Sequence, residues 1–210
     1  MLTVYGSDLS GPANKVRFVA NHLALNYEYK QLNLRGGEQK EPWFLAINPV
    51  GKVPAIKDDD FCLFESNAIC KYLCDKQGSA LYPKSLKERA TVDQWVDFSS
   101  LHIMANVSKV MFNRVFAKRV GLPVSEESIA DGLKFLAQQF PVIEEQLTKH
   151  DYVAGQTITL ADMALLSSID PCHVCGIELT AYPKLQAWQQ RLMKEPFYTK
   201  CFNRYGEALK

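Results

Sequence analysis

The spacing of hydrophobic positions changes character near residue 80 of the chain. Before this point, short runs alternate between apolar and polar residues as strands do, and segments with helical spacing separate them. The predicted strands are residues 2–6, 27–34, 54–58 and 61–66. The predicted helices are residues 10–25, 36–48 and 66–77. This βαβαββα order predicts a small α/β layer with a sheet of mixed direction.

The rest of the chain has no strand pattern and is predicted to be helical. Gly, Ser and Pro residues at 78–86 predict a linker. The helices predicted after it are residues 87–118, 125–148, one that begins at 159, 183–194 and a short tail helix after Pro196. The sequence therefore predicts two domains, an α/β domain of residues 1–77 and an all-α domain of residues 87–210.

Two of the predicted helices begin with residues that satisfy unpaired backbone amides. Ser10 is a candidate N-cap, and Pro12 falls in the first turn, where proline is tolerated. Thr159 and Asp162, in the run "TLAD", have the spacing of a capping box. We interpret this box as a device for folding, with no catalytic role.

Composition and charge narrow the class of protein. Of the 210 residues, 47% are hydrophobic and 22% are charged, as in an ordinary globular protein with a sizeable core. The net charge of +1 gives no bulk field that would favour nucleic acid or an anionic membrane. No apolar run is long enough to span a membrane, and "MLTVYGSDLSGP" lacks the features of a signal peptide. We therefore expect a cytoplasmic protein without nucleic-acid or membrane partners.

Six cysteines raise the question of metal or redox chemistry. The motif "CHVC", Cys172 to Cys175, lacks a second pair of ligands at zinc spacing and follows a helical run instead of a strand. Cys70 and Cys74 lie one helical turn apart, which indicates a shared buried face. We expect these thiols to pack in the core and expect no metal site.

The stretch "GKVPAIKDDDFCLFESNAICKYL" carries the candidate binding chemistry. Ser66 begins a predicted helix, whose first amides and hydroxyl form an anion site, and Glu65 could pair with an ammonium group. Together they suit an α-amino acid end group, although a plain N-cap beside a solvated charge is the simpler alternative. From the frequency of such bonds alone, the Val53–Pro54 peptide is expected to be trans.

The combination "NPVGKVPAI…LFESNAICKYL", followed by "TLAD" at 159–162, resembles the glutathione transferase superfamily along nearly the whole chain. "SGPANKVR" and "NVSKVMFNRVF" are most similar to its serine-type phi and theta groups. The resemblance implies a thioredoxin-like N-terminal domain, an all-α C-terminal domain and a cis Val53–Pro54 bond. It also implies a homodimer.

The resemblance assigns residues to the binding of glutathione. Ser10 would be the catalytic hydroxyl that holds the glutathione thiolate, with Tyr5 and Ser7 as alternatives. The residues implied to bind glutathione are Gln39, Lys52, Val53, Pro54, Glu65 and Ser66. Gln39 departs from the histidine that is frequent at this position in the serine-type groups, and Lys40 is a further candidate for the glycine end.

The sequence is compatible with two functions. The first is a transferase that conjugates glutathione, its co-substrate, to small hydrophobic electrophiles in detoxification, with peroxide reduction or isomerisation as variants. No permanently bound cofactor is expected. The second is a non-catalytic assembly module similar to the transferase-like domain of the gamma subunit of translation elongation factor one, which "GKVPAIKDDDFCLFESNAI" also resembles.

Overall fold

A mixed sheet organises the N-terminal part of the chain. The strands are β1 (Leu2–Gly6), β2 (Tyr27–Gln31), β3 (Ala55–Asp58) and β4 (Phe61–Phe64). They lie in the order β2-β1-β3-β4, with β2 parallel to β1 and the other pairs antiparallel. The predicted order of elements and the mixed direction of the sheet are confirmed.

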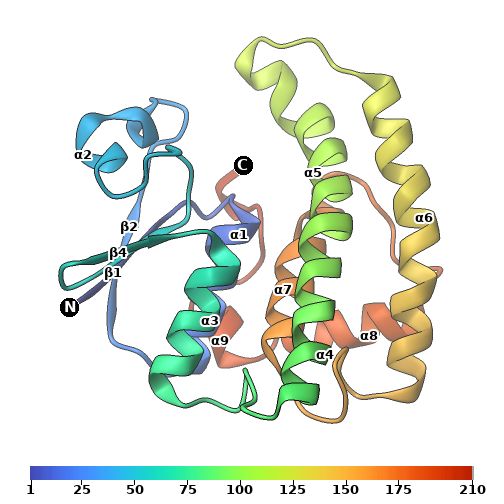
Figure 1. Ribbon diagram of the computed structural model, residues 1–210. Coiled ribbons are helices and arrows are strands. Elements are labelled where there is room, and N and C mark those ends of the chain that lie inside the picture. Colours follow the sequence, from blue (N-terminus) through green and yellow to red (C-terminus); the bar gives the residue numbers. More distant parts are fainter. Residues whose placement is uncertain (210) are drawn as a thin grey trace. The chain divides into compact units, whose positions relative to one another are not determined.

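Helices cover both faces of this sheet. Helices α1 (Gly11–His22) and α3 (Ser66–Gln77) pack against each other, as Figure 1 shows. The short α2 (Pro42–Leu45), preceded by a 3-10 turn at Glu38–Lys40, covers the face that carries Tyr5 and Ala55. Because side chains alternate along a strand, Val4 points to the opposite face and is fully buried there.

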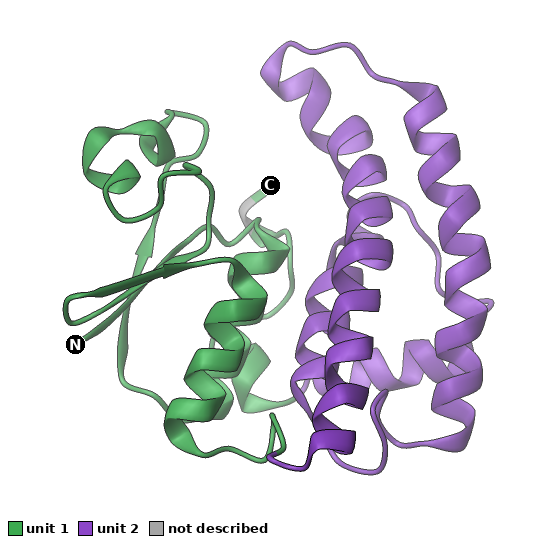
Figure 2. Cartoon of the chain, in the orientation of Figure 1, with its two compact units in different colours: residues 1–83, 195–210 green, residues 84–194 purple. Residues whose placement is uncertain are grey.

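The structure, a computed structural model, describes residues 1–209, and Figure 2 shows its two compact units. The first unit combines Met1–Pro83 with Glu195–Lys210, and the second is Lys84–Lys194. These compact units differ from the predicted domains, because the predicted all-α domain of residues 87–210 included the residues from Glu195 onward. Helix α9 (Pro196–Thr199) joins the first unit because the Phe197 and Tyr198 rings pack on Phe18 of α1, at 5.9 and 5.3 Å between centroids.

Two residues of the predicted linker at 78–86 are buried. Leu81 and Tyr82 are only 2% and 7% exposed, so their apolar side chains belong to the core of the first unit. The Gly, Ser and Pro content of this segment does not reveal that these two residues are buried.

The second unit is built of helices. They are α4 (Leu86–Asp97), α5 (Ala105–Met111), α6 (Glu126–Lys149), α7 (Leu160–Ile169) and α8 (Pro183–Leu192), with 3-10 turns at Ala117–Val120 and Asp170–His173. A further 3-10 turn at Glu207–Leu209 lies in the first unit. Within the described residues, none of the helices is both long and apolar enough to cross a bilayer.

The single helix predicted at 87–118 is interrupted by two π-helical segments, Phe98–Met104 and Phe112–Phe116. The side-chain amides of Asn106 and Asn113 donate to the carbonyls of His102 and Lys109, at 2.9 Å each. These side chains compete with the backbone amides for those carbonyls, which is a physical reason for a local change in helical pitch. Periodicity alone does not reveal such a change.

The predicted capping box of α7 is present and deeply buried. Asp162 has no exposed surface, and its carboxylate accepts hydrogen bonds from the Thr159 and Val153 amides at 2.8 and 3.0 Å. It also accepts from the Thr159 hydroxyl and the Trp188 indole, at 3.2 Å each. Burial raises the pKa of Asp162 to about 6.

Candidate functional site

The pairing register brings the predicted site residues to one edge of the sheet. Gly6, at the end of β1, pairs with Gln31 at the end of β2. Ala55, at the start of β3, pairs with Tyr5 on one side and with Phe64, at the end of β4, on the other. The segments that follow β1, β2 and β4 carry Ser10, Gln39 and Glu65–Ser66, respectively, and the segment that precedes β3 carries Val53–Pro54. Since neighbouring strands lie about 4.8 Å apart, these segments share one edge.

Ser10 is the N-cap of α1, as the sequence predicts. Its Oγ accepts a hydrogen bond from the Ala13 amide at 3.3 Å, near the long limit of such a bond. The side chain is neither buried nor fully exposed. Among the described residues, none accepts a hydrogen bond from the Ser10 hydroxyl, so its proton remains available to a ligand.

The two alternative hydroxyls lie in different surroundings. Tyr5 is 5% exposed and belongs to an apolar cluster with Leu32, Phe44 and Ala55. Ser7 is 8% exposed, and its Oγ accepts from the Leu9 amide at 3.4 Å. The geometry therefore favours Ser10, because Tyr5 packs in the core and Ser7 stabilises the turn that precedes α1.

The Val53–Pro54 peptide bond is cis. The expectation of a trans bond, drawn from general frequencies, is wrong, and the cis bond implied by the family resemblance is confirmed. The preceding turn is held by the buried Asn48, whose side chain donates to the Lys52 carbonyl at 2.6 Å and accepts from the Val50 amide at 3.0 Å. Lys52 itself is exposed.

Gln39 and Lys40 lie beside this turn. The Gln39 amide group donates to the Leu34 carbonyl at 3.2 Å, and its buried Oε1 has no partner in the described structure. The Lys40 ammonium donates to the Val50 carbonyl at 3.1 Å. Gly51 has a φ of +63°, and a Cβ there would lie 2.9 Å from the Gln39 carbonyl, so only glycine fits this close approach.

Glu65 and Ser66 form the start of α3, where the sequence places them. Glu65 has a φ of +69°, a conformation that non-glycine residues rarely adopt. Such backbone strain costs about 1–3 kcal/mol and is concentrated at functional sites. No side chain caps this helix end, and the first amides of α3 therefore keep their capacity to bind an anion.

A buried contact ties the two helix starts of the site together. The Lys15 ammonium of α1 donates to the side-chain oxygen of Asn67 in the first turn of α3. Lys15 is only 3% exposed, so this bond is shielded from water. The start of α1, which holds Ser10, and the start of α3, which holds Ser66, are thereby fixed with respect to each other.

Four of the six cysteines pack in the core. All six thiols are free, and Cys70, Cys74, Cys172 and Cys175 are buried. Burial raises the pKa of Cys70 to about 12 and that of Cys175 to about 11, which keeps both thiols protonated and unreactive. Within residues 1–209, no group of three or more His, Cys, Asp or Glu side chains is placed to hold a metal ion.

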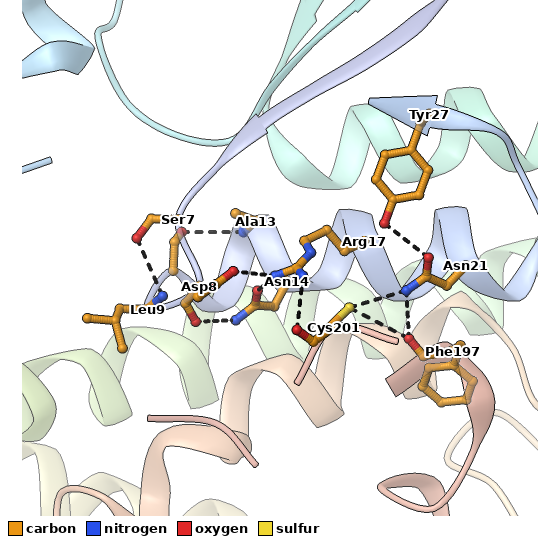
Figure 3. A network of polar contacts seen from close by, with 11 residues as sticks. Ser7, Asp8, Leu9, Ala13, Asn14, Arg17, Asn21, Tyr27, Phe197 and Cys201 are labelled. Atoms are coloured by element: carbon orange, nitrogen blue, oxygen red, sulfur yellow. Dashed lines mark hydrogen bonds and ion pairs between the residues drawn. The ribbon is translucent and has the colours of Figure 1, made fainter. Parts of the chain in front are cut away.

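Several residues that shape the site were missed by the sequence reasoning. Asn48 was detectable, since Asn-Pro is a turn signal and a polar residue often fixes such a turn. Asp8, Arg17 and Tyr205 hold the loop that precedes Ser10, as partly shown in Figure 3. No local pattern in the sequence points to these three. Tyr205 lies 196 residues from Leu9, and Arg17 lies 184 residues from Cys201.

Comparison with known families matches both parts of the chain. The family model "Glutathione S-transferase, N-terminal domain" matches residues 1–75. The model "Glutathione S-transferase, C-terminal domain" matches residues 103–196.

Curated relatives and solved structures agree with these matches. The chain is 34% identical to "Probable glutathione S-transferase GSTF2" of Oryza sativa subsp. japonica, over 93% of each chain. It is 35% identical to "Glutathione S-transferase F10" of Arabidopsis thaliana, over 79% of this chain and 78% of the relative. The structure of glutathione transferase F7 from Populus trichocarpa superimposes with a TM-score of 0.88 at 28% identity, covering 96% of this chain and 97% of the other.

A structure of glutathione S-transferase-I bound with the ligand lactoylglutathione superimposes with a TM-score of 0.86 at 30% identity, covering 95% of this chain and 97% of the other. The relatives described here are named as transferases, so they give no support to the elongation-factor alternative. The matched domains and the plant relatives together show that this chain belongs to the glutathione S-transferase family, in its serine-type, phi-like grouping.

Proposed function

We propose that this chain conjugates glutathione to small hydrophobic electrophiles and that the Ser10 hydroxyl stabilises the reacting thiolate. The observation that carries the proposal is the placement of Ser10. It lies at the N-terminus of α1, at the sheet edge shared with Glu65–Ser66, and its proton is available.

The chemistry requires a thiolate at neutral pH. A free thiol of this type has a pKa of about 8.5, so only a few per cent is ionised at pH 7. A hydrogen bond donated to the sulfur and a helix N-terminus both favour the charged form. Ser10 supplies the first and α1 the second. The thiolate then attacks an electrophilic carbon, a carbon–sulfur bond forms, the leaving group departs with its electron pair, and the thiol proton passes to solvent.

The other residues of the site suit the remainder of the tripeptide. The amides at the start of α3 and the Ser66 hydroxyl match the carboxylate of the γ-glutamyl end, and Glu65 matches its ammonium group. The backbone of Val53, before the cis Pro54, is available to pair with the peptide backbone of the ligand. Gln39 and Lys52 lie in segments at the same edge and suit its glycine end.

Finer features of the proposal follow from family membership. The protein acts as a homodimer in the cytoplasm and contributes to detoxification. Glutathione is a co-substrate, with no permanently bound cofactor. Peroxide reduction is a variant of the same thiolate chemistry and uses the same Ser10.

The test is the rate of conjugation of glutathione to 1-chloro-2,4-dinitrobenzene, in which the thiolate displaces chloride. Loss of a single preorganised donor typically costs about 100- to 1000-fold, so we expect Ser10→Ala to lower kcat/KM by about 100-fold or more. Tyr5→Phe is the matched control, and we expect it to change kcat/KM by less than about threefold. Ser7→Ala loses only the 3.4 Å bond from the Leu9 amide and should lower kcat/KM far less than Ser10→Ala does.

Two outcomes would contradict the proposal. Full activity of the Ser10→Ala variant would show that Ser10 does not stabilise the thiolate. A loss of kcat/KM in Tyr5→Phe or Ser7→Ala as large as that expected for Ser10→Ala would assign this role to Tyr5 or Ser7. A wild-type protein that neither binds glutathione nor conjugates it would overturn the proposed activity itself.

A further inference from the structure

The C-terminal segment of the chain holds the loop that carries Ser10. Tyr205 is 2% exposed, and its hydroxyl donates to the Leu9 carbonyl at 2.8 Å, across 196 residues of sequence. We propose that Tyr205, with Arg17, is a positioning residue that fixes the Ser10 hydroxyl for the thiolate. This inference rests on the proposed function of Ser10.

Both ends of the peptide group between Leu9 and Ser10 are held. The Leu9 carbonyl accepts from Tyr205, and the Ser10 amide donates to the Ser7 carbonyl at 2.9 Å. A peptide group is planar, so fixing its carbonyl and its amide fixes its orientation. The direction in which the Ser10 side chain leaves the backbone is set by this plane and by the first turn of α1.

The preceding peptide group is held in a similar way. The Asp8 carbonyl accepts from the Asn14 side chain at 2.8 Å, and the Leu9 amide donates to the Ser7 hydroxyl at 3.4 Å. The Asp8 carboxylate accepts from the Arg17 guanidinium at 2.6 Å. The loop therefore has little freedom to move relative to α1.

Arg17 connects this loop to the C-terminal segment. Its guanidinium donates to Asp8 and, at 3.1 Å, to the Cys201 carbonyl, as Figure 3 shows. It stacks 4.1 Å from the centre of the Tyr29 ring and is only 7% exposed. A planar group with several fixed donors suits this bridging role, and its burial protects the ion pair from screening by salt.

The position of Tyr205 is itself well defined. Its amide donates to the Tyr198 hydroxyl at 3.3 Å, and Tyr198 is fully buried against Phe18 of α1. The hydroxyl that reaches Leu9 is thus anchored to the same helix that Ser10 caps. Because a hydrogen bond weakens steeply with poor distance or angle, a displaced Ser10 would stabilise the thiolate less.

The experiment compares Tyr205→Phe with Tyr72→Phe. The control also loses a tyrosine hydroxyl that donates a hydrogen bond, in this case to the carboxylate of Asp58 at 2.7 Å, at the far end of β3 from Ala55. The readout is the pKa of the bound glutathione thiol, from the ultraviolet absorption of the thiolate and from the pH profile of kcat/KM.

We expect Tyr205→Phe to raise the thiol pKa by about 0.5 to 1, which lowers the thiolate fraction about three- to tenfold at pH values well below that pKa. The loss of kcat/KM should disappear above that pKa. We expect Tyr72→Phe to leave the thiol pKa unchanged. A loss of folding stability alone would move the melting temperature in both variants but not the thiol pKa.

A second variant, Arg17→Lys, keeps the positive charge but lacks the planar group that donates to both Asp8 and the Cys201 carbonyl, and it should also raise the thiol pKa. Equal thiol pKa values in Tyr205→Phe, Arg17→Lys and the wild type would overturn the positioning role. The Ser10→Ala variant separates the proposed function of Ser10 from the positioning role of Tyr205 and Arg17. If Ser10→Ala leaves the thiol pKa unchanged, the proposed function of Ser10 fails. If Ser10→Ala raises the thiol pKa and the positioning variants do not, only the positioning role fails.

Discussion

Two helix starts in this protein use the same residue chemistry for different purposes. Helix α7 begins at a box of Thr159 and Asp162, which is buried and accepts four hydrogen bonds at its carboxylate. Helix α1 begins at Ser10, which is partly exposed and makes one long bond to Ala13. The Thr159 hydroxyl donates a hydrogen bond to Asp162, whereas the Ser10 hydroxyl has no acceptor among residues 1–209.

This difference shows that the same local motif serves folding where it is buried and can serve ligand binding where it is accessible. A buried cap must satisfy every polar atom, because an unpaired buried group costs about 1–3 kcal/mol. A cap at an accessible sheet edge has no such requirement, since water or a ligand supplies the missing partner. The unused hydrogen-bonding capacity of Ser10 is therefore what makes it a candidate for function.

The largest effect on stability should come from removing the buried carboxylate. We expect Asp162→Ala to lower the free energy of unfolding by about 3–4 kcal/mol, because four donors lose their acceptor inside the protein. Urea unfolding measures this change. The fraction that remains folded should bind glutathione with unchanged affinity, and a selective loss of binding would contradict a purely structural role.

A second prediction concerns the pH dependence of the same group. Burial raises the pKa of Asp162 from 3.8 to about 6, so the folded state binds this proton more tightly than the unfolded state does. The part of the stability that is linked to this proton is then fully present below pH 4 and is lost as the pH rises through 6, in addition to the effect of the four hydrogen bonds. The total change is about 3 kcal/mol.

The measurement for this prediction is urea unfolding of the wild type and of Asp162→Asn at a series of pH values. The asparagine does not titrate, so other groups cancel in the difference between the two proteins. We expect the difference to decrease as the pH rises from 4 to 6.5. A difference that is constant with pH would show that Asp162 has an ordinary pKa.

The smallest effect on stability should come from the accessible cap. We expect Ser10→Ala to cost about 1 kcal/mol or less, since the bond to Ala13 is long and water can replace it. Thermal unfolding checks this value against the large loss of activity expected for the same variant. A destabilisation as large as that of Asp162→Ala would end the distinction between the two helix starts.

The sequence was most informative where a motif is local. The N-cap at Ser10, the box at Thr159–Asp162 and the start of α3 at Ser66 depend on residues within one helical turn, and their places were predicted correctly. The order of strands and helices along residues 1–77 followed from alternating patterns and turn residues. The family motif in "KVPA" corrected the conformation of Val53–Pro54 that general frequencies suggested.

The sequence was least informative where partners are distant. The assignment of α9 to the first unit depends on contacts of Phe197 and Tyr198 with Phe18, which no local pattern encodes. The π-helical segments depend on how Asn106 and Asn113 compete for carbonyls. The burial of Leu81, inside the predicted linker, is also a property of the folded unit that composition does not reveal.

By itself, the sequence determined the elements, the family and the residue types available for binding glutathione, because periodicity, caps and turn motifs act over a few residues. Only the tertiary structure decided which hydroxyl keeps an available proton and which polar groups are used up in folding. It also decided that a tyrosine near the C-terminus reaches the loop before Ser10. These outcomes depend on burial and on pairing between distant residues, which arise only when the chain has folded.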